Sequence, residues 1–107
     1  MYSRTVTCTV DSSKINEFRK TLNEKFLPRI QAQPGFVDNL ESLEPATGEF
    51  SCTTLWNTKS DVEAYDKGLF QEIAAALGPA MVEGPSVKTL PVENSSAHGV
   101  AAGQAAA

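Results

Sequence analysis

Gln33-Pro34-Gly35-Phe36 separates a segment with helical periodicity from a segment with strand periodicity. Pro34 cannot continue a helix, and Gly35 can adopt the left-handed backbone conformation that a sharp exit from a helix requires. Joints of the same kind recur at Gly78-Pro79 and Gly84-Pro85, again between a helical pattern and a strand pattern. The sequence therefore predicts two strand–helix–strand halves.

The first half opens with alternation over residues 3–10, where Val6, Cys8 and Val10 face one side and threonines face the other. Alternation of β-branched residues is typical of a strand. Apolar residues then recur at spacings of three and four, which predicts an amphipathic helix that ends near Gln31. The expected core positions of this helix are Ile15, Phe18, Leu22, Phe26 and Ile30.

Three further strands are expected after this first helix. Those over residues 36–44 and 49–57 are close in sequence and form a hairpin. The last is predicted over residues 86–93, and Pro91 marks it as an edge or bulged strand, because proline cannot donate to a sheet ladder.

A second helix separates the hairpin from the last strand. Ser60-Asp61-Val62-Glu63 has the pattern of a capping box, with Ser60 as the cap and Glu63 reaching back. The helix ends near Gly78. Its expected core positions are Val62, Tyr65, Leu69, Ile73 and Leu77.

The element order β-α-β-β-α-β predicts a ferredoxin-like α+β domain over residues 1–94, with a four-stranded antiparallel sheet and both helices on one face. Residues 95–107 form a low-complexity tail that is expected to be a mobile end. Leu55, Leu90 and Val92 fall on the other face of the sheet. Because that face also needs a cover, the pattern favours a homodimer.

Composition excludes several classes of protein. The chain has 107 residues, enough for one domain, and its net charge is −4 with scattered basic residues, which argues against a nucleic-acid partner. No apolar run approaches the length of a membrane span, and residues 1–10 alternate rather than form the apolar block of a signal peptide, so a cytoplasmic protein is expected. Cys8 and Cys52 are expected to be buried free thiols, with a disulfide possible only if their strands are adjacent and the compartment is oxidising.

Four ordered motifs carry a family resemblance. They are Gln33-Pro34-Gly35-Phe36, Leu55-Trp56-Asn57, Ser60-Asp61-Val62-Glu63-Ala64-Tyr65 and Gly84-Pro85-Ser86-Val87. Together they resemble the antibiotic biosynthesis monooxygenase superfamily of dimeric α+β barrels, over residues 3 to about 93. The resemblance implies a homodimer whose sheets pack face to face, and a small-molecule pocket in each subunit. Some members oxidise polycyclic phenols to quinones with molecular oxygen and without metal or flavin, others degrade haem, and others isomerise or bind small molecules.

The chain departs from the pattern of the haem-degrading branch. Tyr65 stands where many members have a histidine, and Ala74 stands near the position of the axial histidine, where it cannot ligate iron. Threonines replace the asparagine that this branch uses in its first strand. Haem degradation is therefore not expected, and no cofactor or metal is expected.

Trp56, Tyr65 and Asn57 are the candidate catalytic residues. Trp56 can stack on a flat aromatic substrate and donate its indole N–H, unless it serves only as a large core residue. Tyr65 lies on the core side of the second helix, where its hydroxyl can position a substrate or transfer a proton, although a buried tyrosine with one partner is the plainer reading. Asn57 can donate to a developing phenolate, unless it binds local backbone.

Other polar residues are expected to have surface roles. His98, the single histidine, lies in the tail and is rejected as a general base. Arg4 and Arg29 could pair with an acidic substrate, but surface positions are the default, and Asp66 and Glu72 are expected on the solvated face of the second helix. The sequence lacks a phosphate loop, a Ser-His-Asp set and Cys/His metal spacing.

The favoured function is a cofactor-independent monooxygenase acting on a small aromatic substrate of the phenol or quinol type. The alternative is a non-catalytic small-molecule binder or stress-associated dimer on the same scaffold. A purely structural dimer, in which side chains fill the space between helices and sheet, is a third possibility.

Overall fold

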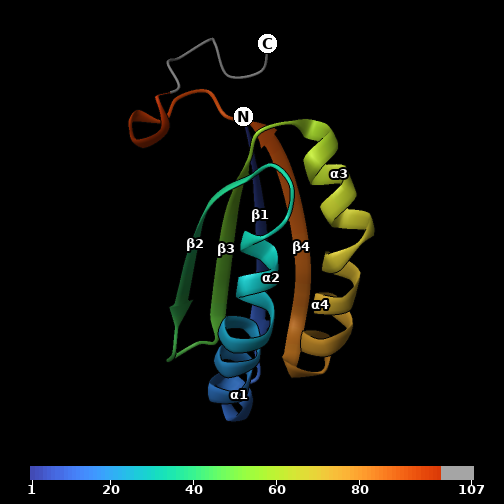
Figure 1. Ribbon diagram of the computed structural model, residues 1–107. Coiled ribbons are helices and arrows are strands. Elements are labelled where there is room, and N and C mark those ends of the chain that lie inside the picture. Colours follow the sequence, from blue (N-terminus) through green and yellow to red (C-terminus); the bar gives the residue numbers. More distant parts are fainter. Residues whose placement is uncertain (100–107) are drawn as a thin grey trace.

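Four antiparallel strands form one sheet in the order β2-β3-β1-β4, and the helices cover one face of it (Figure 1). The computed structural model describes residues 1–99. The strands are β1 Tyr2–Val10, β2 Phe36–Glu44, β3 Glu49–Trp56 and β4 Met81–Pro91. This is the predicted ferredoxin-like α+β fold.

The first helical stretch is continuous but changes type along its length. It runs through η1 Ser12–Lys14, α1 Ile15–Lys20, the π-helical segment η2 Thr21–Phe26 and α2 Leu27–Gln31. Pro28 explains the change, because its ring would clash with the carbonyl four residues earlier in a regular α-helix. All five expected core positions of this stretch are buried, which confirms the predicted periodicity.

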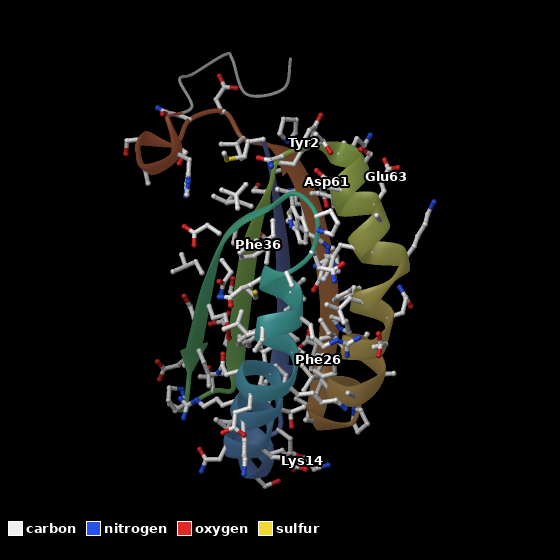
Figure 2. All side chains as sticks on the ribbon, in the orientation of Figure 1. Tyr2, Lys14, Phe26, Phe36, Asp61 and Glu63 are labelled. Carbon is white, nitrogen blue, oxygen red and sulfur yellow. The ribbon has the colours of Figure 1, made fainter. Side chains whose placement is uncertain are left out.

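Gly35 lies after this helical stretch and turns the chain into β2. Its φ is +81°, in the region that favours glycine, and an added Cβ would collide with the Asp61 carboxylate. Figure 2 shows Asp61 at the same end of the molecule as Phe36 and Tyr2, with Lys14 at the opposite end. The predicted joint therefore lies at the start of β2, next to the second helix.

The second helix is divided into α3 Lys59–Lys67 and α4 Leu69–Leu77, followed by η3 Gly78–Ala80. Gly68, with φ −105° and ψ −105°, interrupts the helical backbone between them. The five predicted core positions are all buried. The predicted cap is wrong: Thr58, not Ser60, is the N-cap, because the Thr58 hydroxyl accepts the Asp61 N–H at 3.1 Å and the helix begins at Lys59.

The last strand starts earlier than predicted, at Met81 rather than residue 86. Gly84-Pro85 lies inside β4, at a register shift opposite Thr7 and Thr9, instead of preceding the strand. Gly84 has φ +86°, and an added Cβ would lie 2.9 Å from the Thr7 carbonyl oxygen. Since β4 is an edge strand, as Pro91 predicts, its prolines remove few ladder hydrogen bonds.

The two faces of the sheet differ. Buried side chains of β1 and β3 pack against the helices and form the core. On the opposite face, Leu55 and Leu90 both lie beside Ser3, and Leu40 lies beside Thr53. Leu40 is 69% exposed and Leu90 is 50% exposed.

The last strand also ends earlier than predicted, so that Val92 is outside it. Val92 lies beyond the end of β4 and is buried. Its backbone N–H donates to the carbonyl oxygen of Met1 at 2.9 Å.

Between the end of β4 and residue 99 the chain forms one short 3₁₀ turn, η4 Ser96–His98. His98 Nε2 lies 3.1 Å from Asp38 Oδ2 on β2. The predicted tail extends to residue 107, and its part from residue 100 onward lies outside the described residues. Within residues 1–99, no helix combines the length and apolar character needed to cross a membrane.

Candidate binding cavity

A cavity of about 50 Å³ lies between the sheet and the helices that cover it. Its apolar wall comes from both helical stretches, with Phe18 and Leu22 on one side and Ile73 and Leu77 on the other. The space is large enough for only a few water molecules. The lining also includes residues with polar side chains from β1, β3 and α3, namely Arg4, Cys8, Cys52, Thr54 and Tyr65, although the surface of the cavity is almost entirely apolar.

Arg4 is the charged residue of the lining, and its side chain is only 2% exposed. Its Nε donates to Asp66 Oδ1 at 2.6 Å. Its Nη2 is buried and has no hydrogen-bond partner within the described part of the chain. A buried guanidinium nitrogen without an acceptor is costly, so Arg4 brings an unmet hydrogen-bond donor to a residue that lines the cavity.

Two aromatic rings hold the Arg4 guanidinium. Its central carbon lies 4.0 Å from the ring centroid of Phe70 and 5.1 Å from that of Tyr65. Residues five apart on an uninterrupted α-helix point about 140° away from each other. The break at Gly68 removes this restriction, and both rings reach the same cation.

Tyr65 lines the cavity and is buried. Burial raises the pKa of its hydroxyl to about 12, and the nearby Arg4 cation opposes this only in part. The hydroxyl is therefore protonated at neutral pH and is suited to donate a hydrogen bond rather than to act as a base.

Trp56 packs behind this wall without lining the cavity. It is fully buried, and its ring lies 4.8 Å from that of Tyr65 and 5.8 Å from that of Phe36. The indole Nε1 donates to the Thr54 hydroxyl at 2.8 Å, and that hydroxyl donates to the Arg4 carbonyl oxygen at 3.4 Å. The indole thus supports two lining residues, Tyr65 and Thr54.

Asn57 lies outside the cavity. Its side chain is exposed just after β3, and its backbone N–H donates to the Gly35 carbonyl oxygen at 2.8 Å. The structure therefore brings Trp56 and Tyr65 together but leaves Asn57 apart from them.

Cys8 and Cys52 are free thiols, as predicted, and both line the cavity, but only Cys8 is buried and Cys52 is half-buried. Their strands are adjacent, but Cys8 is opposite Phe50 and Cys52 is opposite Val6, so the two are offset by two residues. Burial, with a smaller contribution from Glu41, raises the pKa of Cys52 to about 12. Burial also raises the pKa of Cys8. Both are protonated, weak nucleophiles at neutral pH.

The expected surface position of Arg4 is wrong. Arg4 is in phase with Val6, Cys8 and Val10 along β1, so the strand alternation itself places it on the helix-covered face. Asp66 turns toward Arg4 rather than lying only on a solvated face, although its side chain is 39% exposed.

The other two charged residues of this group lie at the surface as expected. Arg29 and Glu72 are exposed, and they form an ion pair in which Nη2 lies 2.8 Å from Oε2. Ala74, the position considered for a haem ligand, contributes a methyl group to the cavity wall. Residues 1–99 contain no group of three His, Cys, Asp or Glu side chains arranged to hold a metal ion.

No protein-family model matches the chain, and no curated protein sequence matches it either. Solved structures do. A Deinococcus radiodurans protein that is named after the antibiotic biosynthesis monooxygenases has a TM-score of 0.75 at 13% identity, over 89% of this chain and 95% of its own. A similarly named protein of Nitrosomonas europaea has a TM-score of 0.73 at 18% identity, over 88% of this chain and 100% of its own.

A third structure is a monooxygenase of Streptomyces coelicolor in complex with the ligand Nanaomycin D. It has a TM-score of 0.72 at 14% identity, with 88% of each chain covered. At these identities the likeness establishes the fold. The protein has the fold of the antibiotic biosynthesis monooxygenase superfamily, as its four ordered motifs predict.

Proposed function

We propose that this protein is a cofactor-independent monooxygenase that oxidises a small aromatic phenol or quinol. One observation carries the proposal. The cavity is apolar, and the polar side chains at it include the hydrogen-bond donors Arg4 and Tyr65 but, within the described lining, no Asp, Glu or His. Donors in a dry site stabilise negative charge on oxygen, which is the charge that a reacting phenol develops.

The reaction needs little from the protein. A phenol loses its proton, and the electron-rich phenolate reduces molecular oxygen while one oxygen atom bonds to the ring. The second oxygen atom leaves as water, and the ring becomes a quinone. The substrate supplies all the electrons, so the protein contributes an apolar site that admits oxygen and donors that stabilise the phenolate.

Tyr65 and Trp56 have different roles in this proposal. The Tyr65 hydroxyl donates to the substrate oxygen, since its raised pKa keeps it protonated. Trp56 positions Tyr65 through its ring contact at 4.8 Å. Asn57, being exposed, receives no role.

The Streptomyces coelicolor structure supports a ligand-binding role for this fold, since that monooxygenase holds Nanaomycin D. The cavity here is too small for a polycyclic phenol as it stands. Substrate entry therefore requires lining side chains to move, and the half-buried Met81 can do so because methionine readily repacks.

The test is oxygen uptake by metal-free and flavin-free protein, with quinone absorbance followed in parallel, on a panel of reduced polycyclic phenols and anthrones. We expect saturable uptake above the uncatalysed rate, and about a tenfold lower kcat in Tyr65→Phe. Tyr2→Phe is the matched control, because Tyr2 packs against the core without lining the cavity. Uptake that is unchanged in Tyr65→Phe would remove Tyr65 from the mechanism.

A non-catalytic small-molecule binder is the second candidate. It is favoured by the lack of an acid–base pair at the described lining, because a binding site needs no proton transfer. The same panel separates the two functions. Ligand binding without oxygen uptake on any substrate selects the binder.

We also propose that the protein is a homodimer. The face of the sheet that no helix covers carries Leu40, Leu55 and Leu90 among hydroxyl-bearing residues, and two of these leucines are at least half exposed. A second copy of the sheet packed on this face would cover them.

A further inference from the structure

We propose that the cavity is a binding site for an aromatic oxyanion, with Nη2 of Arg4 as the donor that recognises the ionised oxygen. The ligand class is an aromatic ring that bears one phenolate or carboxylate group. The inference rests on the proposed function for the location of the ligand, but it is tested by binding and without turnover.

The missing acceptor is the first argument. A guanidinium has five N–H donors, and in Arg4 the Nε donor is taken by Asp66. The buried Nη2 has no partner within residues 1–99. A ligand oxygen at the cavity would satisfy it, and a charge-assisted bond to an ionised oxygen is stronger than one to a neutral oxygen.

The charge distribution is the second argument. Arg4 is 2% exposed, whereas its partner Asp66 is 39% exposed and is partly screened by water. Tyr65 and Cys52, with pKa values raised to about 12, are neutral at neutral pH. Arg4 therefore gives the described lining its only formal charge, and the cavity favours an anion.

The walls of the cavity are the third argument. The rings of Phe70 and Tyr65 both lie against the guanidinium, so the cation is held at the cavity wall before a ligand arrives. Most of the other lining residues are apolar, and a flat aromatic ring fits among them once Met81 repacks. The partly exposed lining residues Phe70, Ala74 and Met81 come from α4 and the start of β4, which places the entrance between these elements.

The experiment uses two one-ring probes on the full chain. 4-Nitrophenol reports its own ionisation, because its phenolate absorbs visible light, and benzoate tests the carboxylate. Benzamide is the neutral control. We expect protein to raise the phenolate fraction of 4-nitrophenol at a fixed pH just below the pKa of the free phenol, and benzoate to bind more tightly than benzamide.

Three variants assign the effect to Arg4. Arg4→Gln should weaken binding of the anionic probe by about tenfold to a hundredfold and abolish the absorbance change. Arg29→Gln is the matched control, because it removes the same charge from an exposed pair away from the cavity. Asp66→Asn should tighten anion binding by about two- to fivefold, since it removes the competing negative charge.

The outcomes are separable. A phenolate signal that depends on Arg4 supports the phenolate form of the proposal, and benzoate binding that depends on Arg4 supports the carboxylate form. Anion binding that is the same in Arg4→Gln and wild type overturns the proposal. If Arg4→Gln fails to fold, weaker or unchanged anion binding in Asp66→Asn overturns it.

The proposed reaction can fail independently. Arg4-dependent binding without oxygen uptake would reject the monooxygenase and keep the oxyanion site. Oxygen uptake that is unaffected by Arg4→Gln would reject the oxyanion site and keep the monooxygenase.

Discussion

Nε of Arg4 donates to Oδ1 of Asp66 at 2.6 Å, although Arg4 is buried and Asp66 is 39% exposed. The bond joins β1 to α3, between residues that are 62 positions apart in the sequence. It holds a cation at the wall of an apolar cavity while its counter-ion remains in contact with water. Removal of Asp66 therefore leaves a buried cation without its counter-ion, whereas removal of Arg4 leaves a carboxylate that water can solvate.

Removing Asp66 should cost more stability than removing Arg4. Asp66→Asn leaves a buried guanidinium without its counter-ion, which we expect to cost about 1–2 kcal/mol of unfolding free energy. Arg4→Met replaces the buried cation with an apolar side chain and leaves a carboxylate that water can solvate, so we expect a smaller loss. Urea denaturation of both variants measures the difference.

The exposed pair Arg29–Glu72 provides the control for this comparison. Arg29→Met and Glu72→Gln should each change the unfolding free energy by less than about 0.5 kcal/mol, because exposed ion pairs contribute little. A larger loss in Arg4→Met than in Asp66→Asn would contradict the assigned asymmetry.

The cap of α3 gives a second prediction. Thr58→Ala removes the hydroxyl that accepts the Asp61 N–H at 3.1 Å, and it should cost about 1 kcal/mol of unfolding free energy. Ser60 lies inside the first turn and is exposed, so Ser60→Ala should stay within about 0.5 kcal/mol of wild type. Thermal unfolding of the two variants decides between the observed cap and the one that the Ser-x-x-Glu pattern predicts.

The sequence predicts the fold well because apolar periodicity is a local signal. All ten expected helical core positions are buried, and the Gln33–Phe36 joint begins β2 as expected. Boundaries are less predictable where tertiary contacts decide them. The start of β4 depends on pairing with β1 around Gly84, and the cap at Thr58 is selected over an equally plausible serine nearby.

The cavity is harder to predict than the fold. The position of Tyr65 on the core side of its helix follows from helical periodicity, and the position of Trp56 follows from its place beside the core. Arg4 is missed because a charged residue in a strand is assigned to solvent by default, although its phase along β1 is visible. The burial of Arg4 depends on its contacts with Asp66 and Phe70. These two residues lie more than sixty positions further along the chain, so they leave no local pattern in the sequence around Arg4.

Alkaline pH should destabilise the protein through Cys52 and Tyr65. Burial raises the pKa of each group to about 12, from ordinary values of 9.0 and 10.0. In the unfolded chain these groups lose their protons first, so between about pH 9 and 12 the folded state binds more protons. The unfolding free energy is therefore fully retained below about pH 9 and falls as pH rises toward 12.

Two variants separate the contributions to this pH dependence. Cys52→Ala should reduce the part of the slope that begins near pH 9 and leave the contribution of Cys8, whereas Tyr65→Phe should remove the part that begins near pH 10. The measurement is urea denaturation at a series of alkaline pH values. Slopes that match wild type in both variants would show that other groups govern alkaline unfolding.

The uncovered face of the sheet predicts the behaviour of the dimer. Leu40 and Leu90 lie on this face and are 69% and 50% exposed. A glutamate at either position would bring two like charges into the interface between copies and would leave them desolvated there. We expect Leu40→Glu and Leu90→Glu to convert a species of twice the chain mass into monomer, as measured by light scattering after size exclusion.

The matched control is Val87→Glu. Val87 is 44% exposed and apolar, but it lies opposite Val6 on the helix-covered face of the sheet, at the edge strand. Val87→Glu introduces the same charge outside the proposed interface, so this variant should leave the mass of the dimer unchanged. If Leu40→Glu and Leu90→Glu keep the wild-type mass, this face is not the dimer interface. Dissociation by Val87→Glu alone would instead place the contact at the β4 edge.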